Sequence, residues 1–471
     1  MSVTGESVIE RDLVLLDSLI AEEEAVFLGR NAESRRMRRE CADVLPGGVA
    51  SNWQDAPPGA VWISHGTGSR IVDVDGTSYV DLHGGFGVGL SGHAHPAIVE
   101  AVSDRVRRGT HFAQPTEDTV VVARELARRF GLPLWRFGNS GTESTMDAVH
   151  LMRAATGRMK IIKVEGTYHG HHDSVQVSVY PDTEEAGPSG RPNSVPSGPA
   201  IPPALARLTL VAPFGDLGAV ERLLEENPGE IAGMIIEPIM MNIGLIPPPD
   251  GYLAGLRSLL HRHGAYLAFD EVKTGLAVAP GGAAEWSGVV PDLLCLAKAL
   301  GGGLPCGAIG GIPELMGLIA DGTYEQVGTF NANPLTMAAA RAVVCEILTD
   351  DAYRHFARLR RVMTEGVEEV LRRFGLPGHV RSYGAKGAVI FHDRPLHDYR
   401  DFVEYPDQWG NAHWLYQHNG GVFLPPWGKC EQWTVSVQHS ETDVRRFVSN
   451  LERMAASLRP GDRQAGSAAR R

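Results

Sequence analysis

The amino-acid sequence predicts an α/β fold, in which a large domain with a mainly parallel sheet flanked by helices accompanies a smaller α+β domain. Short apolar runs alternate with segments of helical periodicity between residues 134 and 300. Repeated strand and helix units of this kind form parallel sheets that are covered on both faces. Two of the apolar runs end at charged residues, Asp270 and Lys298. Because ligands bind at the carboxyl edge of such sheets, we expect the functional site there.

Composition excludes several classes of protein. The chain has 471 residues, 43% of them hydrophobic, so it can bury a core large enough for two domains. A formal net charge of -12 argues against a nucleic-acid partner, because phosphate binding requires clustered Lys and Arg. The five cysteines form no C-x-x-C pair, which suits reduced thiols in a cytoplasmic protein. We expect neither a signal peptide nor a membrane span, since the N-terminus is acidic and the apolar runs are short.

Changes in composition along the chain predict its division into regions. The N-terminal residues are rich in Glu, Arg, Leu and Ala at helical spacing, and this pattern ends at Pro46-Gly47-Gly48. Alternating apolar and polar residues around Asp75-Gly76 predict a tight hairpin. The expected regions are a helical extension (1–45), the N-terminal part of the small domain (46–90), the large domain (91–340), the C-terminal part of the small domain (341–457) and a disordered tail (458–471).

In the large domain, strands are expected at residues 135–138, 161–164, 208–211, 231–236, 265–269 and 292–297. After the first strand, Ser140-Gly141-Thr142 predicts a tight turn into a helix that ends before Gly157. Ser140 and Glu143 fit a capping box, which needs no ligand. The same turn also exposes backbone N–H groups at a positive helix terminus, an arrangement that binds phosphate.

Less regular segments follow. Residues 181–203 are dense in Pro, Gly and Ser and predict a long loop, a kind of segment that often forms a lid. Beyond residue 334 the periodicity predicts one helix over about 335–349 and a charged helix ending at Phe374. The remaining C-terminal part reads as strand-rich, with strands near 388–392 and 433–437.

Asp270 and Lys298 indicate a particular chemistry. A lone Asp often caps a turn and a lone Lys often extends its amine to solvent, so neither requires a function. However, a lysine in an apolar site has a lowered pKa, and its free amine can form a Schiff base with an aldehyde. An aldehyde cofactor with a pyridine ring requires a carboxylate at the ring nitrogen. The pair therefore favours a cofactor site with Lys298 as the anchor and Asp270 as the partner of the ring.

Two histidine-rich stretches suggest a metal at first sight. The pair His93 and His95 precedes a proline at a helix start, which favours a turn and a helix cap, and no carboxylate follows at ligand spacing. Residues 168–173 read Y-H-G-H-H-D, whose spacing does not match a hydrolase metal motif. We therefore expect no metal site. Tyr168 could stack on a planar ring or simply pack in the core.

Taken together, these segments resemble the class III aminotransferases, which are fold type I pyridoxal-phosphate enzymes, and within that family the glutamate-1-semialdehyde 2,1-aminomutase branch. The resemblance covers about residues 46–446. It rests on the order and spacing of FGNSGTES (137–144), EGTYHGHHD (165–173), ENPGEIAGMIIEPIMMNIG (226–244), FDEVKTGLAVAPGGAAEW (269–286), CLAKALGGGLPCGAIGG (295–311) and GTFNANPLTMAAA (328–340). It implies pyridoxal 5'-phosphate as the cofactor.

The resemblance also implies a role for each residue that matches a family motif. Lys298 would form the internal aldimine and move a proton between cofactor and substrate, while Asp270 would keep the pyridine nitrogen protonated. Tyr168 would stack on one face of the ring, and Val272 would contact the other face. Asn242 would form a hydrogen bond with the 3-hydroxyl of the cofactor.

The phosphate end of the cofactor has its own set of matching residues. Ser140, Gly141 and Thr142 match the phosphate-binding turn of the family. Thr329 matches a residue that reaches the phosphate of the neighbouring subunit. The resemblance therefore implies a homodimer with shared active sites.

The segments that recognise substrate differ from those of the aminomutases. In that branch, P-G-G-V is followed by N-S-P-V-R, whose arginine binds the substrate carboxylate, whereas PGGVASNWQ places Gln54 there, beside Trp53. The aminomutase gating loop with its G-S-G turn is replaced by VSVYPDTEEAGPSGRPNSVPSG (177–198). The candidate substrate residues are therefore Trp53, Gln54 and His169.

We therefore expect an aminotransferase that moves an amino group between an amine or amino-acid donor and an oxo-acid acceptor, through internal aldimine and pyridoxamine forms. One alternative is an aminomutase that returns the amine to the same substrate. A second alternative is a non-catalytic pyridoxal-phosphate-binding protein, and the presence of both Lys298 and Asp270 counts against it. These residues leave the donor, the acceptor and the stereochemistry open.

Overall fold

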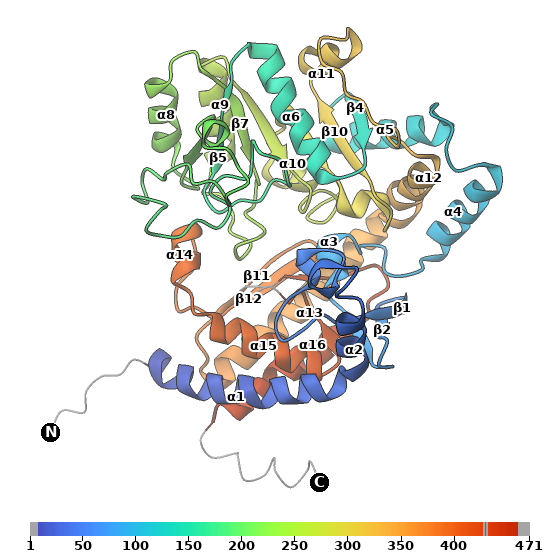
Figure 1. Ribbon diagram of the computed structural model, residues 1–471, viewed down its shortest axis with the longest axis vertical. Coiled ribbons are helices and arrows are strands. Elements are labelled where there is room, and N and C mark those ends of the chain that lie inside the picture. The colour runs from blue at the N-terminus through green and yellow to red at the C-terminus, as the bar shows by residue number, and fades with distance from the viewer. Residues whose placement is uncertain (1–7, 427–428, 430–431, 460–471) are drawn as a thin grey trace, which may run out of the picture.

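The computed structural model describes residues 8–426, 429 and 432–459, so the tail expected at 458–471 lies outside the described residues from 460 onward (Figure 1). A seven-stranded sheet with its helices occupies the upper part of the molecule in Figure 1, and a four-stranded and a three-stranded sheet lie below it. The large, mainly parallel sheet confirms the predicted α/β class.

The large sheet has the strand order β4-β10-β9-β8-β7-β5-β6. Its strands are β4 (Leu134–Gly138), β5 (Lys160–Val164), β6 (Thr209–Ala212), β7 (Ile231–Ile236), β8 (Tyr266–Asp270), β9 (Leu293–Leu296) and β10 (Gly307–Gly311). Neighbouring strands from β6 to β9 pair in parallel. Every residue of β7 and β9 is buried, which explains why these strands are continuous apolar runs without polar alternation.

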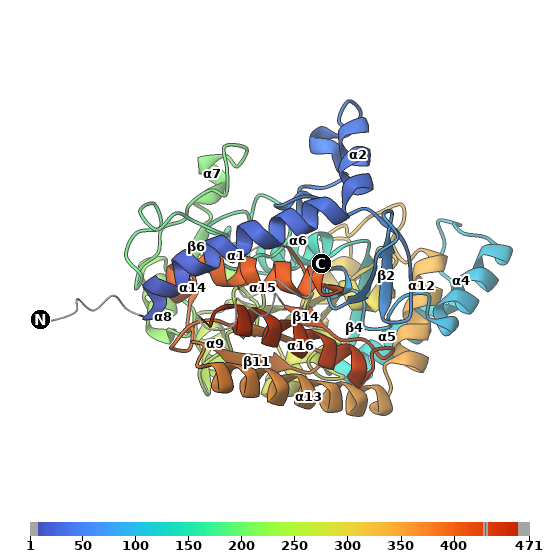
Figure 2. The same ribbon diagram turned by 90° about the horizontal axis from the view of Figure 1, so that it is seen from below.

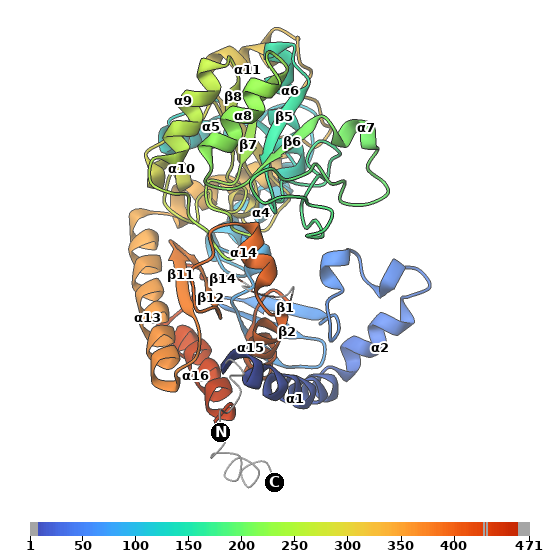
Figure 3. The ribbon, with the colours of Figure 1, turned by 90° about the vertical axis from the view of Figure 1, so that its left-hand side faces the viewer.

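Helices pack on both faces of this sheet (Figure 3). The α-helices between residues 91 and 342 are α4 (Pro96–Arg108), α5 (Glu117–Phe130), α6 (Gly141–Thr156), α7 (Pro203–Ala206), α8 (Leu217–Glu226), α9 (Tyr252–Arg262), α10 (Gly282–Ser287), α11 (Pro313–Ala320) and α12 (Pro334–Ala342), of which α7 projects away from the sheet (Figure 3). Strand β8 shows the two-residue alternation that this layering requires. Leu267 and Phe269 join the core on the side of α8 and α9, whereas Ala268 joins the core on the side of α6 and α11.

The two smaller sheets combine segments from both ends of the chain. Their strands are β1 (Ile63–Thr67), β2 (Arg70–Asp73), β3 (Ser78–Asp81) and β13 (Val422–Phe423) in one sheet, and β11 (His379–Tyr383), β12 (Lys386–Ile390) and β14 (Trp433–Thr434) in the other. The predicted hairpin at Asp75-Gly76 joins β2 to β3. Because β13 pairs with β3, we propose that residues 46–90 and 341–457 form one small domain beside a large domain of residues 91–340.

The remaining elements surround these smaller sheets or connect them to the large one. They are α1 (Val8–Arg30), α2 (Ala32–Glu40), α3 (Gly84–Gly87), α13 (Asp350–Phe374), α14 (Tyr399–Glu404), α15 (Asp407–Asn419) and α16 (Glu441–Ser457), with short turns η1 (Pro46–Gly48), η2 (Asn52–Gln54), η3 (Lys298–Gly301) and η4 (Val343–Ile347). Helix α1 lies along α15 (Figure 2) and buries Leu16 and Phe27. The predicted N-terminal extension is thus helical, with α1 packed on the small sheets and α2 projecting from them (Figures 2 and 3).

Two expectations about these elements were wrong. Strand β10 pairs antiparallel with both β9 and β4, and its sequence hid it because Ile309 is its single β-branched residue and glycine is depleted in strands. The C-terminal part is largely helical, although its sequence reads as strand-rich. Helix α15 is buried along most of its length, so it shows no amphipathic pattern by which a helix is recognised.

The loop at residues 181–202 contains no helix or strand, as predicted, but it is anchored at its start. Tyr399 Oη donates to Pro181 O at 2.8 Å, and Arg400 donates to the carbonyl oxygens of Ala186 and Gly187. Arg400 also binds the buried Glu165 in a bidentate pair at 2.7 and 2.8 Å. Helix α14 therefore fixes this loop to the end of β5. In the part of the chain that the structure describes, no helix is both long and apolar enough to cross a membrane.

Candidate active site

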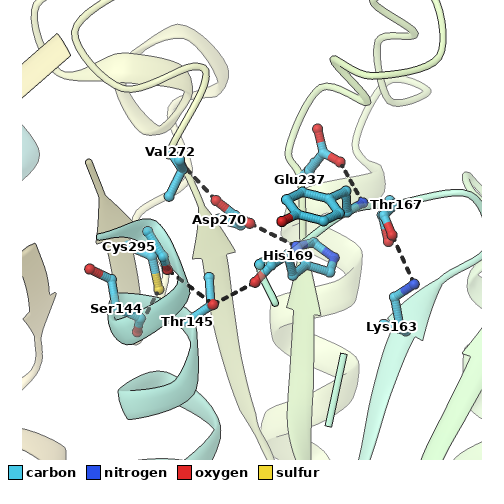
Figure 4. Close-up of polar contacts among 12 residues, drawn as sticks. Ser144, Thr145, Lys163, Thr167, His169, Glu237, Asp270, Val272 and Cys295 are labelled. Atoms are coloured by element: carbon cyan, nitrogen blue, oxygen red, sulfur yellow. Dashed lines mark hydrogen bonds and ion pairs between the residues drawn. The ribbon is translucent and has the colours of Figure 1, made fainter. Parts of the chain in front are cut away.

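Asp270 is the last residue of β8 and lies at the carboxyl edge of the large sheet. Figure 4 shows its carboxylate between Val272 and His169. The backbone N–H of Val272 donates to Oδ1 at 3.0 Å, and His169 Nδ1 donates to Oδ2 at 2.8 Å. His169 is itself buried, and its Nε2 atom has no hydrogen-bond partner among the described residues. The carboxylate is thus held in one orientation by two donors and removed from bulk solvent.

Lys298 follows the next strand of the sheet, β9, and begins the turn η3. Its backbone lies in the left-handed region, with φ at +45°, a conformation that costs a non-glycine residue about 1–3 kcal/mol and that is common at functional sites. Burial of the amine, together with the nearby charge of Lys273, lowers the pKa of Lys298 to about 8, although Asp270 and Glu237 act in the opposite direction. About a tenth of the amine is therefore neutral, and nucleophilic, at pH 7, far more than for an ordinary lysine.

The turn before α6 lies beside these two residues. Ser140 caps the helix, since its side chain accepts from the backbone N–H of Glu143 at 3.2 Å. The capping box is incomplete, because the Glu143 carboxylate binds the backbone N–H of Asn139 and not that of Ser140. A Cβ atom on Gly141 would lie 2.9 Å from both methyl groups of Val272. The glycine therefore allows the turn to approach the segment that carries Asp270.

The strand end at 165–170 adds an aromatic side chain to the site. Thr142 Oγ1 accepts from the backbone N–H of His171 at 3.1 Å, which ties this segment to the turn before α6. Tyr168 precedes His169, and its ring centroid lies 5.2 Å from that of Trp53. Trp53 also contacts Phe86 at 5.2 Å. The expected substrate residue Trp53 thus lies next to the expected ring-stacking residue Tyr168.

Glu237, Asn242 and Lys273 form a polar group that connects the ends of β7 and β8. The buried Glu237 accepts from the backbone of Tyr168 at 3.3 Å and from Asn242 Nδ2 at 3.1 Å. Lys273 Nζ donates to Asn242 Oδ1 at 2.6 Å. Burial raises the pKa of Glu237. The hydrogen bonds with Glu237 and Lys273 therefore fix the orientation of the Asn242 amide.

Two expected residues lie apart from this group. Gln54 is exposed, and its side-chain oxygen accepts from the backbone N–H of Ala50 at 3.1 Å, so the amide is folded back on its own turn. Thr329 is exposed on the surface and lines a cavity of about 740 Å³ between α5 and the start of α12. Asn331, two residues later, accepts from Asn139 Nδ2 at 3.1 Å, so this segment lies close to the turn before α6.

The histidines that suggested a metal have other partners. His93 Nε2 pairs with Asp81 at 2.6 Å, and His95 caps α4. His172 contacts Thr145, and burial lowers its pKa to about 3. Among the described residues, no group of three or more metal-binding side chains is gathered.

The sequence profile described as "Aminotransferase class-III" matches residues 50–431. The chain belongs to the class III aminotransferases. The glutamate-1-semialdehyde 2,1-aminomutase 2 of Brevibacillus brevis is 36% identical to it over 421 residues, which cover 88% of this chain and 96% of that protein.

Solved structures agree with this family assignment. An omega-transaminase from Sphaerobacter thermophilus superimposes with a TM-score of 0.86 at 34% identity, covering 90% of this chain and 97% of the other. A glutamate-1-semialdehyde-aminomutase variant from Pseudomonas aeruginosa PAO1, solved in complex with PMP, gives 0.87 at 29% identity, with 95% and 99% covered. The chain is therefore a pyridoxal-phosphate-dependent enzyme of fold type I, as the sequence predicted.

The residues on this side of the molecule fit that cofactor. The 16-residue helix α6 presents the backbone N–H groups of its first turn for a phosphate. Lys298 supplies an amine that can be neutral, and Asp270 supplies a buried carboxylate for a pyridine nitrogen. The sequence analysis missed Glu237 and Lys273 as parts of the site. Glu237 directly follows the expected strand at 231–236, and Lys273 lies four residues beyond the expected strand at 265–269, so their position near strand ends was the signal that could have found them.

Proposed function

We propose that the enzyme transfers an amino group between two separate molecules, from an amine or amino-acid donor to an oxo-acid acceptor. The observation that carries the amino-transfer chemistry is the juxtaposition of Lys298, with its lowered pKa, and the buried, doubly hydrogen-bonded Asp270 at neighbouring strand ends. Both residues are present and positioned, which argues against a non-catalytic binding protein.

Lys298, Asp270 and His169 have separate roles in this proposal. Bound pyridoxal phosphate supplies an aldehyde that takes up the amino group and a ring that accepts electrons from the substrate. Lys298 would anchor the cofactor through its amine, and the same amine would accept and return a proton as a general base. Asp270 holds a proton at the ring nitrogen. His169 acts through Asp270 as a positioning residue, because it is buried behind that carboxylate and does not face a substrate.

The remaining cofactor contacts are proposed on the same basis. Ser140, Gly141 and Thr142 bind the phosphate at the start of α6. Tyr168 and Val272 contact the two faces of the ring. Asn242, oriented by Glu237 and Lys273, binds the 3-hydroxyl. Trp53 lines the substrate side, since its ring contacts that of Tyr168.

Transfer between two molecules is favoured over an intramolecular aminomutase reaction by Gln54. A planar arginine fork binds a carboxylate through two charge-assisted hydrogen bonds, whereas Gln54 carries no charge, and its side-chain oxygen accepts from the backbone N–H of Ala50, so only its amide N–H groups could donate. The aminomutase reaction remains the second candidate, because the relatives at 36% and 29% identity include aminomutases.

Two measurements test this proposal. Borohydride reduction of the holoenzyme should leave the cofactor mass on the peptide that contains Lys298, and mass on Lys273 or Lys163 would refute the anchor. A panel of donors with pyruvate or 2-oxoglutarate should yield exchanged amino and oxo products. Efficient formation of 5-aminolevulinate from glutamate-1-semialdehyde alone, without an acceptor, would instead establish the aminomutase.

Two further features support proposals about the oligomeric state and the cellular compartment of the enzyme. The position of Thr329 on the surface near the turn before α6 supports a homodimer in which this residue reaches the phosphate of the other subunit. Cys41, Cys295, Cys306 and Cys345 are free thiols, which supports a reducing compartment such as the cytoplasm.

A further inference from the structure

Lys386 is a buried lysine outside the expected cofactor set. It begins β12, its side chain is only 1% exposed, and it lies between β14 and the glycine-rich turn α3. Its Nζ atom donates to Thr434 Oγ1 at 3.2 Å. A Cβ atom on Gly87 would lie 2.2 Å from Nζ, so the amine occupies space that only a glycine leaves open.

No negative charge among the described residues balances this amine. A protonated lysine carries three N–H donors, and the Thr434 hydroxyl accepts one of them. The charged groups near enough to affect its pKa are two further lysines, Lys273 and Lys298, and together with burial they lower the pKa well below its ordinary value. Buried lysines are normally paired, so this amine stays neutral until an anion binds beside it and favours its protonated form.

The backbone places Lys386 on the reaction side of the site. Ala385 N donates to Ala277 O at 2.9 Å, and a Cβ atom on Gly384 would lie 2.0 Å from that same carbonyl oxygen. The β11–β12 turn therefore packs directly against the segment that follows Asp270 and carries Lys273. Lys298 and Lys273 are close enough to lower the pKa of Lys386, and Lys273 also binds Asn242, so the amine of Lys386 lies toward the part of the site that carries these residues.

We infer that Lys386 binds the carboxylate of the substrate, on the amino donor and on the oxo acid in turn. This inference deepens the proposed amino transfer and rests on it. In the aminomutase branch an arginine at the position of Gln54 binds the substrate carboxylate. Gln54 is a neutral amide whose oxygen accepts from Ala50, so the positive charge for a carboxylate has to come from another residue. Arg191 in the long loop does not fill the role, since its side chain is 71% exposed and pairs with Glu226 on the surface.

The test compares an inert carboxylate with its neutral amide on the holoenzyme. Binding of 3-phenylpropanoate and of 3-phenylpropanamide is followed through the cofactor absorbance, so no turnover is needed. The wild type should bind the carboxylate about ten- to hundredfold more tightly than the amide, as a charge-assisted hydrogen bond predicts. Lys386→Met should abolish this preference and leave the affinity for the amide unchanged.

Two further variants make the comparison specific. Lys386→Gln keeps a donor for Thr434 without the charge and should also lose the preference. Lys160→Met removes a lysine that pairs with Glu230 far from the site, and it should retain the wild-type preference. Loss of an unpaired buried amine should not lower the midpoint of thermal unfolding, so a folded Lys386→Met protein is expected.

The outcomes separate the inference from the proposed function. Equal binding of the two probes by the wild type, or an unchanged preference in Lys386→Met, would overturn the inference while amino transfer by the wild type still stood. Weakened binding of the cofactor in Lys386→Met, with the carboxylate preference retained, would assign Lys386 to the cofactor phosphate and also overturn it. A wild type that prefers the carboxylate but exchanges no amino group would refute the proposed function alone.

Discussion

Lys298 combines a buried amine with a left-handed backbone, and both features make the folded protein less stable. The fall in its pKa from 10.5 to about 8 corresponds to about 3 kcal/mol. Between these pH values the unfolded chain binds more protons than the folded chain, so the free energy of unfolding rises with pH. Below about pH 8 both states are protonated at this residue, and the full penalty applies.

In the cofactor-free protein, Lys298→Met should therefore be more stable than the wild type at pH 7, by up to about 3 kcal/mol. This advantage should shrink as the pH rises from about 8 to 10, because the wild type alone gains stability there. Urea unfolding of both proteins across this range measures the difference. A pH-independent difference would show that the amine of Lys298 is not destabilised by burial.

From the sequence, a functional residue could be recognised only where it lies at the end of a predicted strand. Asp270 and Lys298 end apolar runs, so their place at the sheet edge followed from strand topology. Lys386 gave no such signal, because it lies in a short Y-G-A-K-G-A stretch more than eighty positions further on. Its importance depends on burial and on its lack of a counter-ion, which arise only when distant segments pack together.

At the scale of the structural elements, the contact between α14 and the loop at 181–202 determines whether that loop can move as a lid. Arg400 and Glu165 form a largely buried pair, and removing one partner of such a pair costs about 3–5 kcal/mol. Arg400→Met should lower the free energy of unfolding by about that amount and make the loop more sensitive to protease. Urea unfolding and limited proteolysis provide the measurement.

Arg394→Met is the matched control for this element. Arg394 pairs with Glu404 near the same helix, but both side chains are more than half exposed, and exposed pairs contribute about 1 kcal/mol or less. If Arg400→Met behaved like this control, the loop would be independent of α14 and free to act as a lid.

The elements that the sequence missed share a physical cause. Strand β10 is rich in glycine because it packs closely on the turn before α6, where a Cβ atom on Gly307 would lie 2.2 Å from Ser140 O. Helix α15 has no exposed polar face because α1, α16 and β13 pack around it, and its buried residues include polar side chains such as Gln417 and His418. In both cases tertiary packing selected residues that conceal the local pattern, whereas elements with one exposed face, such as α13, were predicted correctly.

For the molecule as a whole, the sequence predicted the family and the order of the elements. The oligomeric state does not follow from a single chain. Exposed apolar side chains lie on the segment that carries Thr329 and at its cavity. Val327 (81% exposed) and Phe112 (48%) line the cavity, and Phe330 (57%) is exposed on the same segment as Val327. Single exposed apolar residues are ordinary, but a group of them around one cavity is typical of a surface that contacts another protein.

We predict that these residues bury themselves against a second copy of the chain and that the phosphate site depends on this contact. The double variant Val327→Asp, Phe330→Asp introduces two charges into that surface and should convert the dimer to monomers, as measured by sedimentation velocity. Its affinity for the cofactor should fall as well, because each subunit would lose the Thr329 of its neighbour. Val14→Asp places a charge on an equally exposed apolar residue of α1 and should change neither property. A wild type that sediments as a monomer would place the functional unit within a single chain, and a double variant that stays dimeric with full cofactor affinity would show that Val327 and Phe330 do not hold the interface.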